Sequence, residues 1–161
     1  MKKGECLIDG WDEAKIKEIL DKQQKKVRAA KKQGHTTIEG ICIVCDDSAD
    51  NSRSMNSQVL TSMFTRQRHN LASIILMSQR YRLMHPNNRV NATALFVFRL
   101  RNNKDLLAIL EENSALATQG TLHEVYDIAT REEYQFLYID LTKSDPNLAF
   151  FKGFKSRLQV E

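Results

Sequence analysis

The sequence lacks the features that mark several classes of protein. It has no apolar run near the ~20 residues that a membrane-spanning helix requires, and its first residues, MKKGECLIDGWDEAK, contain no apolar core of a secretory signal. Internal repeats and low-complexity tracts are missing as well. We therefore expect a cytoplasmic protein that is not secreted and has no membrane partner.

Cysteine is scarce, with Cys6, Cys42 and Cys45 as the three examples. An odd number without a disulfide framework fits a reducing compartment. Cys42 and Cys45 are spaced as C-x-x-C, but no second pair completes the four ligands of a structural zinc site. Residues three apart in a strand also face opposite sides. The pattern therefore favours buried, apolar cysteines over a zinc site.

The remaining composition is that of a globular chain. Its 161 residues are 42% hydrophobic and 27% charged, which predicts a single domain over residues 1–161. The net charge of +4 permits a polyanionic partner without requiring one. A basic face on the helix predicted over 12–32 has two interpretations, a contact with nucleic acid or simple exposure to solvent.

The order of predicted elements indicates an α/β fold. Because strands alternate with helices, we expect mostly parallel strands flanked by helices. Helices are predicted over 12–32 and 55–69, after Asn102 or Asn103, and from a capping box at Thr121 that follows a stop at Gly120. Strands are predicted at about 38–47, about 72–79, 93–100 and 134–141, with a loop and a short docking helix in the tail from Ser144.

Two of the predicted strands end abruptly on polar residues. Asp46 and Asp47 follow the run ICIVC, and Ser78 and Gln79 follow LASIILM. Functional groups gather at the carboxyl ends of parallel strands. If the two strands are neighbours, these four side chains share one edge of the sheet.

Adjacent aspartates after an apolar strand are typical of a Walker B element. In that interpretation Asp46 holds Mg²⁺ through water, and Asp47 polarises the water that attacks a γ-phosphate. Gln79 could bind the γ-phosphate or that water, although a capping amide is an equal alternative. Arg66 and Arg68 in FTRQRHN could reach a phosphate on a neighbouring subunit, or form surface ion pairs or contacts with a DNA backbone.

These segments together resemble a known family. ICIVCDD followed by LFTRQRHNLASIILMSQRYRLMHPNNRVNATALFVFRLRN is similar to the poxvirus-type virion DNA-packaging ATPases of the FtsK–HerA group of P-loop NTPases. The ordered match covers about residues 41–91, and the flanks match more weakly. The matching positions are Asp46, Asp47, Thr65, Arg66, Arg68, His69, Ser78, Gln79, Pro86, Arg89 and Asn91.

The resemblance implies part of an ASCE (RecA-like) ATPase sheet that uses ATP and Mg²⁺. It implies Asp46 as the metal residue, Asp47 as the catalytic acid, and Ser78 and Gln79 at the nucleotide. Arg66, Arg68 and Arg89 become candidates for an arginine that acts in trans or contacts DNA. The family's work is the translocation of double-stranded DNA into a capsid by a ring of subunits, in the infected-cell cytoplasm or the virion.

One departure from the family is serious. The phosphate-binding loop G-x-x-x-x-G-K-[ST], which the family carries upstream of the acidic pair, is missing from the sequence. We therefore expect the C-terminal portion of an ATPase core, with weak or no ATP binding of its own. A second chain could supply the loop. The strand around Ser73–Met77 should then have an unpaired edge and uncovered faces.

Two other functions remain open. A non-catalytic nucleic-acid-binding or assembly module could keep the basic helix and the arginines. A metal-dependent phosphoesterase or nuclease could combine Asp46 and Asp47 with Asp9, Asp50 or Asp140, although no spacing ties these acids together.

Overall fold

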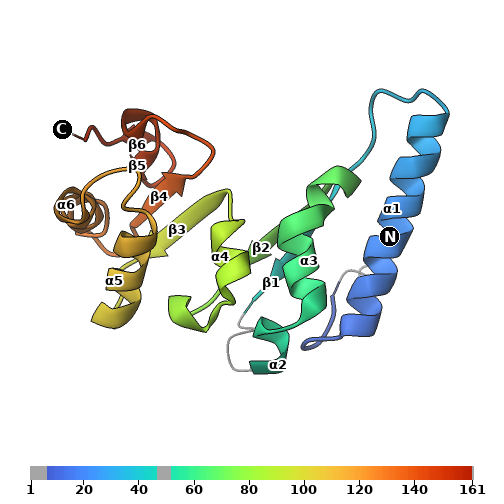
Figure 1. Cartoon of the computed structure of the whole chain (residues 1–161), viewed down its shortest axis with the longest axis horizontal. Coiled ribbons are helices and arrows are strands. Elements are labelled where there is room, and N and C mark those ends of the chain that lie inside the picture. Colours follow the sequence, from blue (N-terminus) through green and yellow to red (C-terminus); the bar gives the residue numbers. More distant parts are fainter. Residues whose placement is uncertain (1–6, 47–51, 161) are drawn as a thin grey trace. The chain divides into compact units, whose positions relative to one another are not determined.

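The computed structural model of the chain describes residues 7–46 and 52–160. The chain divides into two compact units, Met1–Asn91 and Ala92–Glu161, and each is described by itself. Both units combine helices with strands, so the predicted α/β class is confirmed (Figure 1). The single domain over residues 1–161 stays a prediction.

The first unit contains a parallel pair of strands and the helices that accompany it. In chain order its elements are α1 (Glu13–Lys32), β1 (Ile41–Cys45), α2 (Ser52–Met55), α3 (Gln58–Arg66), the 3₁₀ turn η2 (Gln67–Asn70), β2 (Ala72–Leu76), the 3₁₀ turn η3 (Tyr81–Leu83) and α4 (Pro86–Val90). The predicted helices and strands of this unit are confirmed, but the helix predicted over 55–69 is divided into α2, α3 and η2.

Helix α1 is fixed at its start and along its buried side. The Asp12 side chain accepts a hydrogen bond from the Lys15 backbone N–H at 3.0 Å, as an N-cap does. Ile16, Leu20 and Val27 recur at helical spacing and are buried. Between them the buried Gln23 amide donates to the backbone oxygens of Glu39 and Asn70, at 2.9 and 3.2 Å. One side chain therefore ties α1 to the segments that precede both strands.

Strands β1 and β2 are parallel and in register from Ile41 opposite Ala72 to Cys45 opposite Leu76. The Ile41 N–H donates to the Leu71 backbone oxygen at 2.9 Å. Gly40 permits this approach, because a Cβ at position 40 would lie 2.7 Å from the same oxygen. The pairing predicted from the two apolar runs is thus confirmed.

The two faces of this strand pair differ. One face packs against a cluster of Ile16, Leu20, Met63 and Ala72, which brings in α1 and α3. On the other face Val44, Ile75 and Met77 are 55%, 47% and 43% exposed. The missing P-loop predicted an unpaired edge and uncovered faces for the strand around Ser73–Met77, and this exposed face agrees with that expectation. Among the described residues β2 pairs only with β1.

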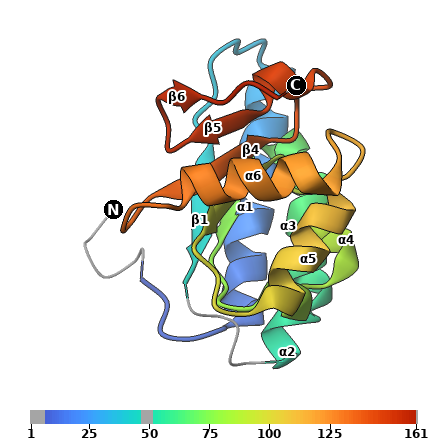
Figure 2. The same cartoon turned by 90° about the vertical axis from the view of Figure 1, so that its left-hand side faces the viewer.

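The second unit is built on an antiparallel sheet in the order β3-β4-β5-β6, of which Figure 2 labels β4, β5 and β6. Its elements are β3 (Ala94–Phe98), α5 (Asn103–Glu112), α6 (Gln119–Ala129), β4 (Phe136–Asp140), the 3₁₀ turn η4 (Pro146–Leu148), β5 (Phe150–Lys152) and β6 (Ser156–Arg157). Helix α6 packs on β4 and β5. The Tyr126 hydroxyl of α6 accepts the Leu100 N–H at 2.7 Å, which anchors the chain after β3.

Three expectations for this unit change. Strands β3 and β4 pair antiparallel, so the mostly parallel P-loop sheet is not confirmed. The tail forms the β5–β6 hairpin instead of a docking helix, with Gly153 in the left-handed region at φ 59°. The capping box predicted at Thr121 is wrong, because Thr118 caps α6 and Gly120 lies inside its first turn.

Aromatic residues gather on one face of this sheet. The buried Val97, Leu137 and Ile139 face the other way, as strand alternation requires. The rings of Phe96 and Tyr138 stack with centroids 5.0 Å apart. The ring of Phe154, which is 73% exposed, contacts both of them. The cluster comprises Phe96, Phe98, Phe136, Tyr138, Phe151 and Phe154.

Gly40→Ala should destabilise the first unit by about 1–3 kcal/mol, because the new methyl group forces the Leu71 backbone away from Ile41. Gly120→Ala is the matched control. Its Cβ would meet only the Thr118 hydroxyl at 3.9 Å, and alanine is the better helix former, by about 0.5–1 kcal/mol. Urea unfolding of both variants measures the difference. Equal stability of Gly40→Ala and the parent would contradict the close approach.

The two strand cysteines should differ in reactivity. Cys42 is exposed, whereas Cys45 is buried and its burial raises the pKa of its thiol. Since the thiolate is the nucleophile, an alkylating reagent at pH 8 should label Cys42 roughly tenfold faster or more. The Cys45 rate should keep rising at more alkaline pH. Tandem mass spectrometry of the modified peptide locates the label, and equal labelling of both thiols in the native protein would refute this strand geometry.

Candidate functional site

The carboxyl ends of β1 and β2 meet at one edge. Cys45 stands opposite Leu76, and the Met77 N–H donates to the Cys45 backbone oxygen at 2.9 Å. Asp46 follows β1 directly and is exposed, and the loop with Ser78 and Gln79 follows β2. Asp47 lies outside the described residues. The structure thus brings the two chain segments together, while the placement of Asp47 against Gln79 stays a prediction.

The loop after β2 is organised by Ser78. Its hydroxyl accepts a hydrogen bond from the Arg80 N–H at 3.2 Å and donates one to the Arg80 backbone oxygen at 3.0 Å. Ser78 is half-buried, whereas Gln79 beside it is exposed. The hydroxyl is therefore engaged within its own turn, and it shapes the loop that presents Gln79.

The three candidate arginines have different surroundings. Arg66 ends α3, is exposed and lines a pocket. Arg68 lies in η2 and is exposed. Arg89 of α4 is half-buried, with its guanidinium carbon 5.1 Å from the ring centroid of the buried Tyr81. Arg89 thus takes part in the packing of its own unit, and Arg66 is the candidate that faces an open volume.

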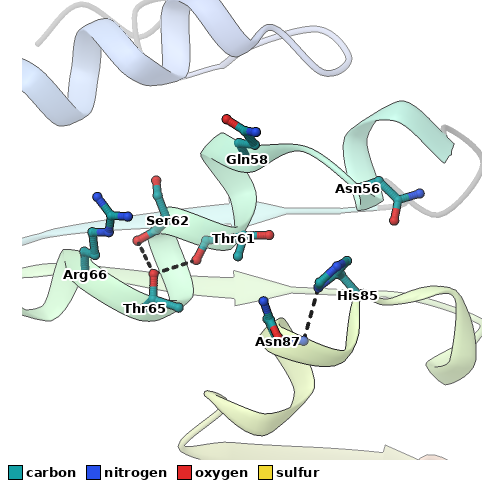
Figure 3. Close-up of a pocket in the computed structure, with 8 residues that line it drawn as sticks. All are labelled: Asn56, Gln58, Thr61, Ser62, Thr65, Arg66, His85 and Asn87. Carbon is teal, nitrogen blue, oxygen red and sulfur yellow. Dashed lines mark hydrogen bonds between the residues drawn. The ribbon is translucent and has the colours of Figure 1, made fainter.

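That pocket has a volume of about 540 Å³ and lies between α3 and α4 (Figure 3). Its wall on α3 is the polar side of the helix, and its opposite wall is the start of α4. Within residues 7–46 and 52–160, no acidic side chain contributes to it, and neither do Ser78 and Gln79. The lining residues are Asn56, Gln58, Thr61, Ser62, Thr65, Arg66, His85 and Asn87. Sequence reasoning singled out Arg66 and missed the pocket, because no local pattern brings α4 to α3.

The basic face of α1 is exposed, in agreement with both interpretations of it. Lys25, Lys31 and Lys32 are exposed and form no ion pair within the part of the chain that the structure describes. Lys26 instead binds the Glu39 carboxylate at 2.7 Å, and this hydrogen bond lowers the pKa of Glu39. Three lysines therefore remain available to a polyanion.

Of the acids considered for a nuclease, Asp47 and Asp50 lie outside the described residues. Asp140 ends β4 in the second unit, where its carboxylate accepts hydrogen bonds from the hydroxyl and N–H of Thr142 at 2.6 and 3.0 Å. The hydroxyl bond is the main cause that lowers the pKa of Asp140. Within residues 7–46 and 52–160, no three or more His, Cys, Asp or Glu side chains cluster as metal ligands would. No helix there could cross a membrane either.

Comparison with known proteins agrees with the resemblance drawn from the motifs. The uncharacterized protein 015R of Frog virus 3 (isolate Goorha) is 23% identical over 129 residues, which are 80% of this chain and 40% of that protein. No solved structure matches. The family model of the poxvirus A32 protein matches residues 11–143. Because this match spans most of the 161 residues, the chain belongs to the poxvirus A32 protein family.

Proposed function

We propose that the chain is part of an ATP-driven translocase that packages double-stranded viral DNA, and that it needs a P-loop its own sequence lacks. The observation that carries the proposal is the parallel, in-register pairing of β1 and β2. This pairing sets Asp46 and the loop with Gln79 at one edge, where ASCE-type ATPases handle the terminal phosphate. Membership of the A32 family supports the same function.

Mg²⁺ and ATP fit the donor groups at this edge. Proteins commonly hold Mg²⁺ with one or two carboxylates, while waters and phosphate oxygens complete its shell. Asp46 and Asp47 are such a pair. When bound, Mg²⁺ neutralises charge on the phosphates.

The remaining roles in ATP hydrolysis are assigned to individual side chains. Asp46 holds the metal through water, and Asp47 takes the proton of the attacking water. Gln79 orients that water or contacts the γ-phosphate, from the loop that Ser78 shapes. A neighbouring subunit in a ring supplies an arginine in trans, for which Arg66, Arg68 and Arg89 are the candidates.

We infer that the chain is incomplete as an ATPase because it lacks the P-loop. The exposed face of the β1–β2 pair agrees with this inference. Without backbone amides and a lysine around the β- and γ-phosphates, an acidic pair alone holds ATP weakly. Val44, Ile75 and Met77 are apolar and exposed beside a strand that pairs on one side only. A neighbouring strand with its helix, from a second chain or another part of a longer protein, would cover this face.

The remaining partners follow from the work of the family. Double-stranded DNA is the transported substrate, a ring of identical subunits holds it, and capsid components anchor the ring. The expected location is the infected-cell cytoplasm or the virion.

Hydrolysis of ATP should require both the P-loop and Asp47. The chain alone should show no ATPase activity above background. Mixed with a polypeptide that carries the P-loop segment of the same family, it should hydrolyse ATP. Asp47→Asn should lower that rate by about 10²–10⁴-fold, because the general base is lost. Phosphate release measures the rate.

Asp21→Asn is the matched control for this experiment. Asp21 is exposed on α1, and its substitution removes the same charge without touching the strand edge. Activity of the chain alone that disappears in Asp47→Asn would refute the incompleteness. Equal loss in both variants would argue against a base at position 47.

The exposed lysines of α1 favour a second function, a non-catalytic nucleic-acid-binding or assembly module derived from such an ATPase. The first unit carries 16 Lys and Arg against 10 Asp and Glu, so the basic excess of the chain lies there. Such a module binds duplex DNA through its phosphates, with an affinity that falls steeply with salt.

Lys25, Lys31 and Lys32 together test this function. Their reversal to Glu should weaken duplex binding by about tenfold or more and flatten its salt dependence, because phosphate contacts are lost. Reversal of Lys104, Lys143 and Lys155 changes the charge equally in the second unit and should have a much smaller effect. Fluorescence anisotropy of a labelled duplex measures both. Unchanged binding in the α1 variant would remove this helix from DNA recognition.

A further inference from the structure

We infer that the pocket between α3 and α4 binds a phosphoryl group, and that Arg66, Thr61 and His85 donate hydrogen bonds to it. The site is distinct from the proposed ATP-hydrolysing edge, because none of Asp46, Ser78 and Gln79 lines it. The inference does not depend on ATP hydrolysis. It concerns binding alone, so it can hold whether or not the chain belongs to an active ATPase.

The first argument is the chemistry of the wall. Among the described residues, hydroxyl, amide, imidazole and guanidinium groups line the pocket without a single carboxylate. Every one of these groups can donate a hydrogen bond, and the guanidinium is always charged. An oxyanion is the ligand that such a wall prefers, and phosphate oxygens match the fork of an arginine.

The second argument is that specific donors are unused. Ser62 and Thr65 give their hydroxyl protons to backbone oxygens of Val59 and Thr61, at 2.8 and 3.0 Å, as Figure 3 shows for Thr65. In contrast, the Thr61 hydroxyl and the Arg66 guanidinium bind no partner among the described residues. Both side chains line the pocket, so two donors of α3 are available to a ligand there.

The third argument comes from the opposite wall. His85 Nδ1 accepts the Asn87 backbone N–H at 3.2 Å, which caps α4 and leaves the ring proton on Nε2. No described residue accepts that Nε2–H, so it is a donor on the pocket wall. Figure 3 shows His85 and Asn87 on α4, across from Thr61 on α3. Donors from two helices therefore face one volume.

The size of the pocket limits its ligand. A volume of about 540 Å³ exceeds a lone phosphate ion and suits a nucleotide or a sugar–phosphate segment of nucleic acid. The shared chemistry is the phosphoryl group. Both sources are compatible with the basic excess of the first unit, and experiment distinguishes them.

Arg66→Gln and Thr61→Val test the site without disturbing the fold. Arg66 is exposed at the end of α3, and Val keeps the shape of Thr while removing its hydroxyl. Arg101→Gln, exposed in the second unit, is the control for loss of one positive charge. His85→Asn removes the imidazole donor but keeps a residue that caps helices well, so α4 should remain. Urea unfolding checks that each variant is folded.

The first measurement uses inorganic phosphate and NMR of the whole chain without Mg²⁺. Phosphate should shift the Arg66 side-chain Nε–H and the Asn87 backbone N–H. In Thr61→Val and His85→Asn the apparent affinity should fall by about tenfold to a hundredfold, as for loss of one hydrogen bond to a charged group. Arg101→Gln should behave as the parent. Absence of both shifts, or an equal loss in the control, would overturn the inference.

The second measurement separates the two sources. Binding of ADP and of a short DNA duplex is compared in the parent, Arg66→Gln and Arg101→Gln. A loss of about tenfold in Arg66→Gln for the duplex alone, with a salt slope reduced by about one, identifies the nucleic-acid backbone. A loss for ADP alone identifies a nucleotide, and a loss for both supports the shared chemistry. If neither ligand is affected, the pocket does not bind a phosphoryl group, whatever the outcome of the ATPase experiment.

Discussion

The backbone ladder between β1 and β2 brings the segments that carry Asp46 and Gln79 to one edge of the first unit. It begins where Gly40 lets the Ile41 N–H reach the Leu71 oxygen, and it ends where the Met77 N–H meets the Cys45 oxygen. Because parallel strands in register end at the same level, a carboxylate segment and an amide segment that are thirty residues apart become neighbours. The crossover between the strands carries α3, so the same ladder also sets the polar wall of the pocket.

Within the described part of the first unit, α1 and α3 pack on one face of this ladder. The Gln23 amide ties α1 to the segments that precede β1 and β2. The cluster that contains Leu20 and Met63 packs against one face of the two strands. The opposite face exposes Val44, Ile75 and Met77, an apolar surface that a two-stranded sheet cannot cover by itself. A strand pair of this kind is stable when further strands or a helix complete the layer. The chain spans 40% of the length of the viral relative that it matches.

Local patterns predicted the first unit better than the second. The apolar runs that end on Asp46 and on Ser78 predicted two parallel strands, because the amphipathic segment between them had room for a crossover helix. The β5–β6 hairpin escaped prediction because FFK is too short to show a strand period, and its pairing with β4 is a tertiary effect. Thr118 and Thr121 are both good helix caps, and only the folded chain selects the first. The pocket was equally invisible, since Thr61 and His85 carry no shared sequence pattern.

The two units differ in net charge, and this difference bears on where nucleic acid would bind. The first unit has 16 basic and 10 acidic residues, whereas the second has 8 basic and 10 acidic, so a polyanion is attracted to the first. The exposed lysines of α1, the donor-lined pocket and the Asp46 edge all lie in that unit. Two acids at a strand tip repel a phosphate chain unless a cation lies between them, while Arg66 attracts it directly. The two proposals, metal-dependent phosphate chemistry at the strand edge and metal-independent phosphate binding between α3 and α4, therefore concern different places on the same unit.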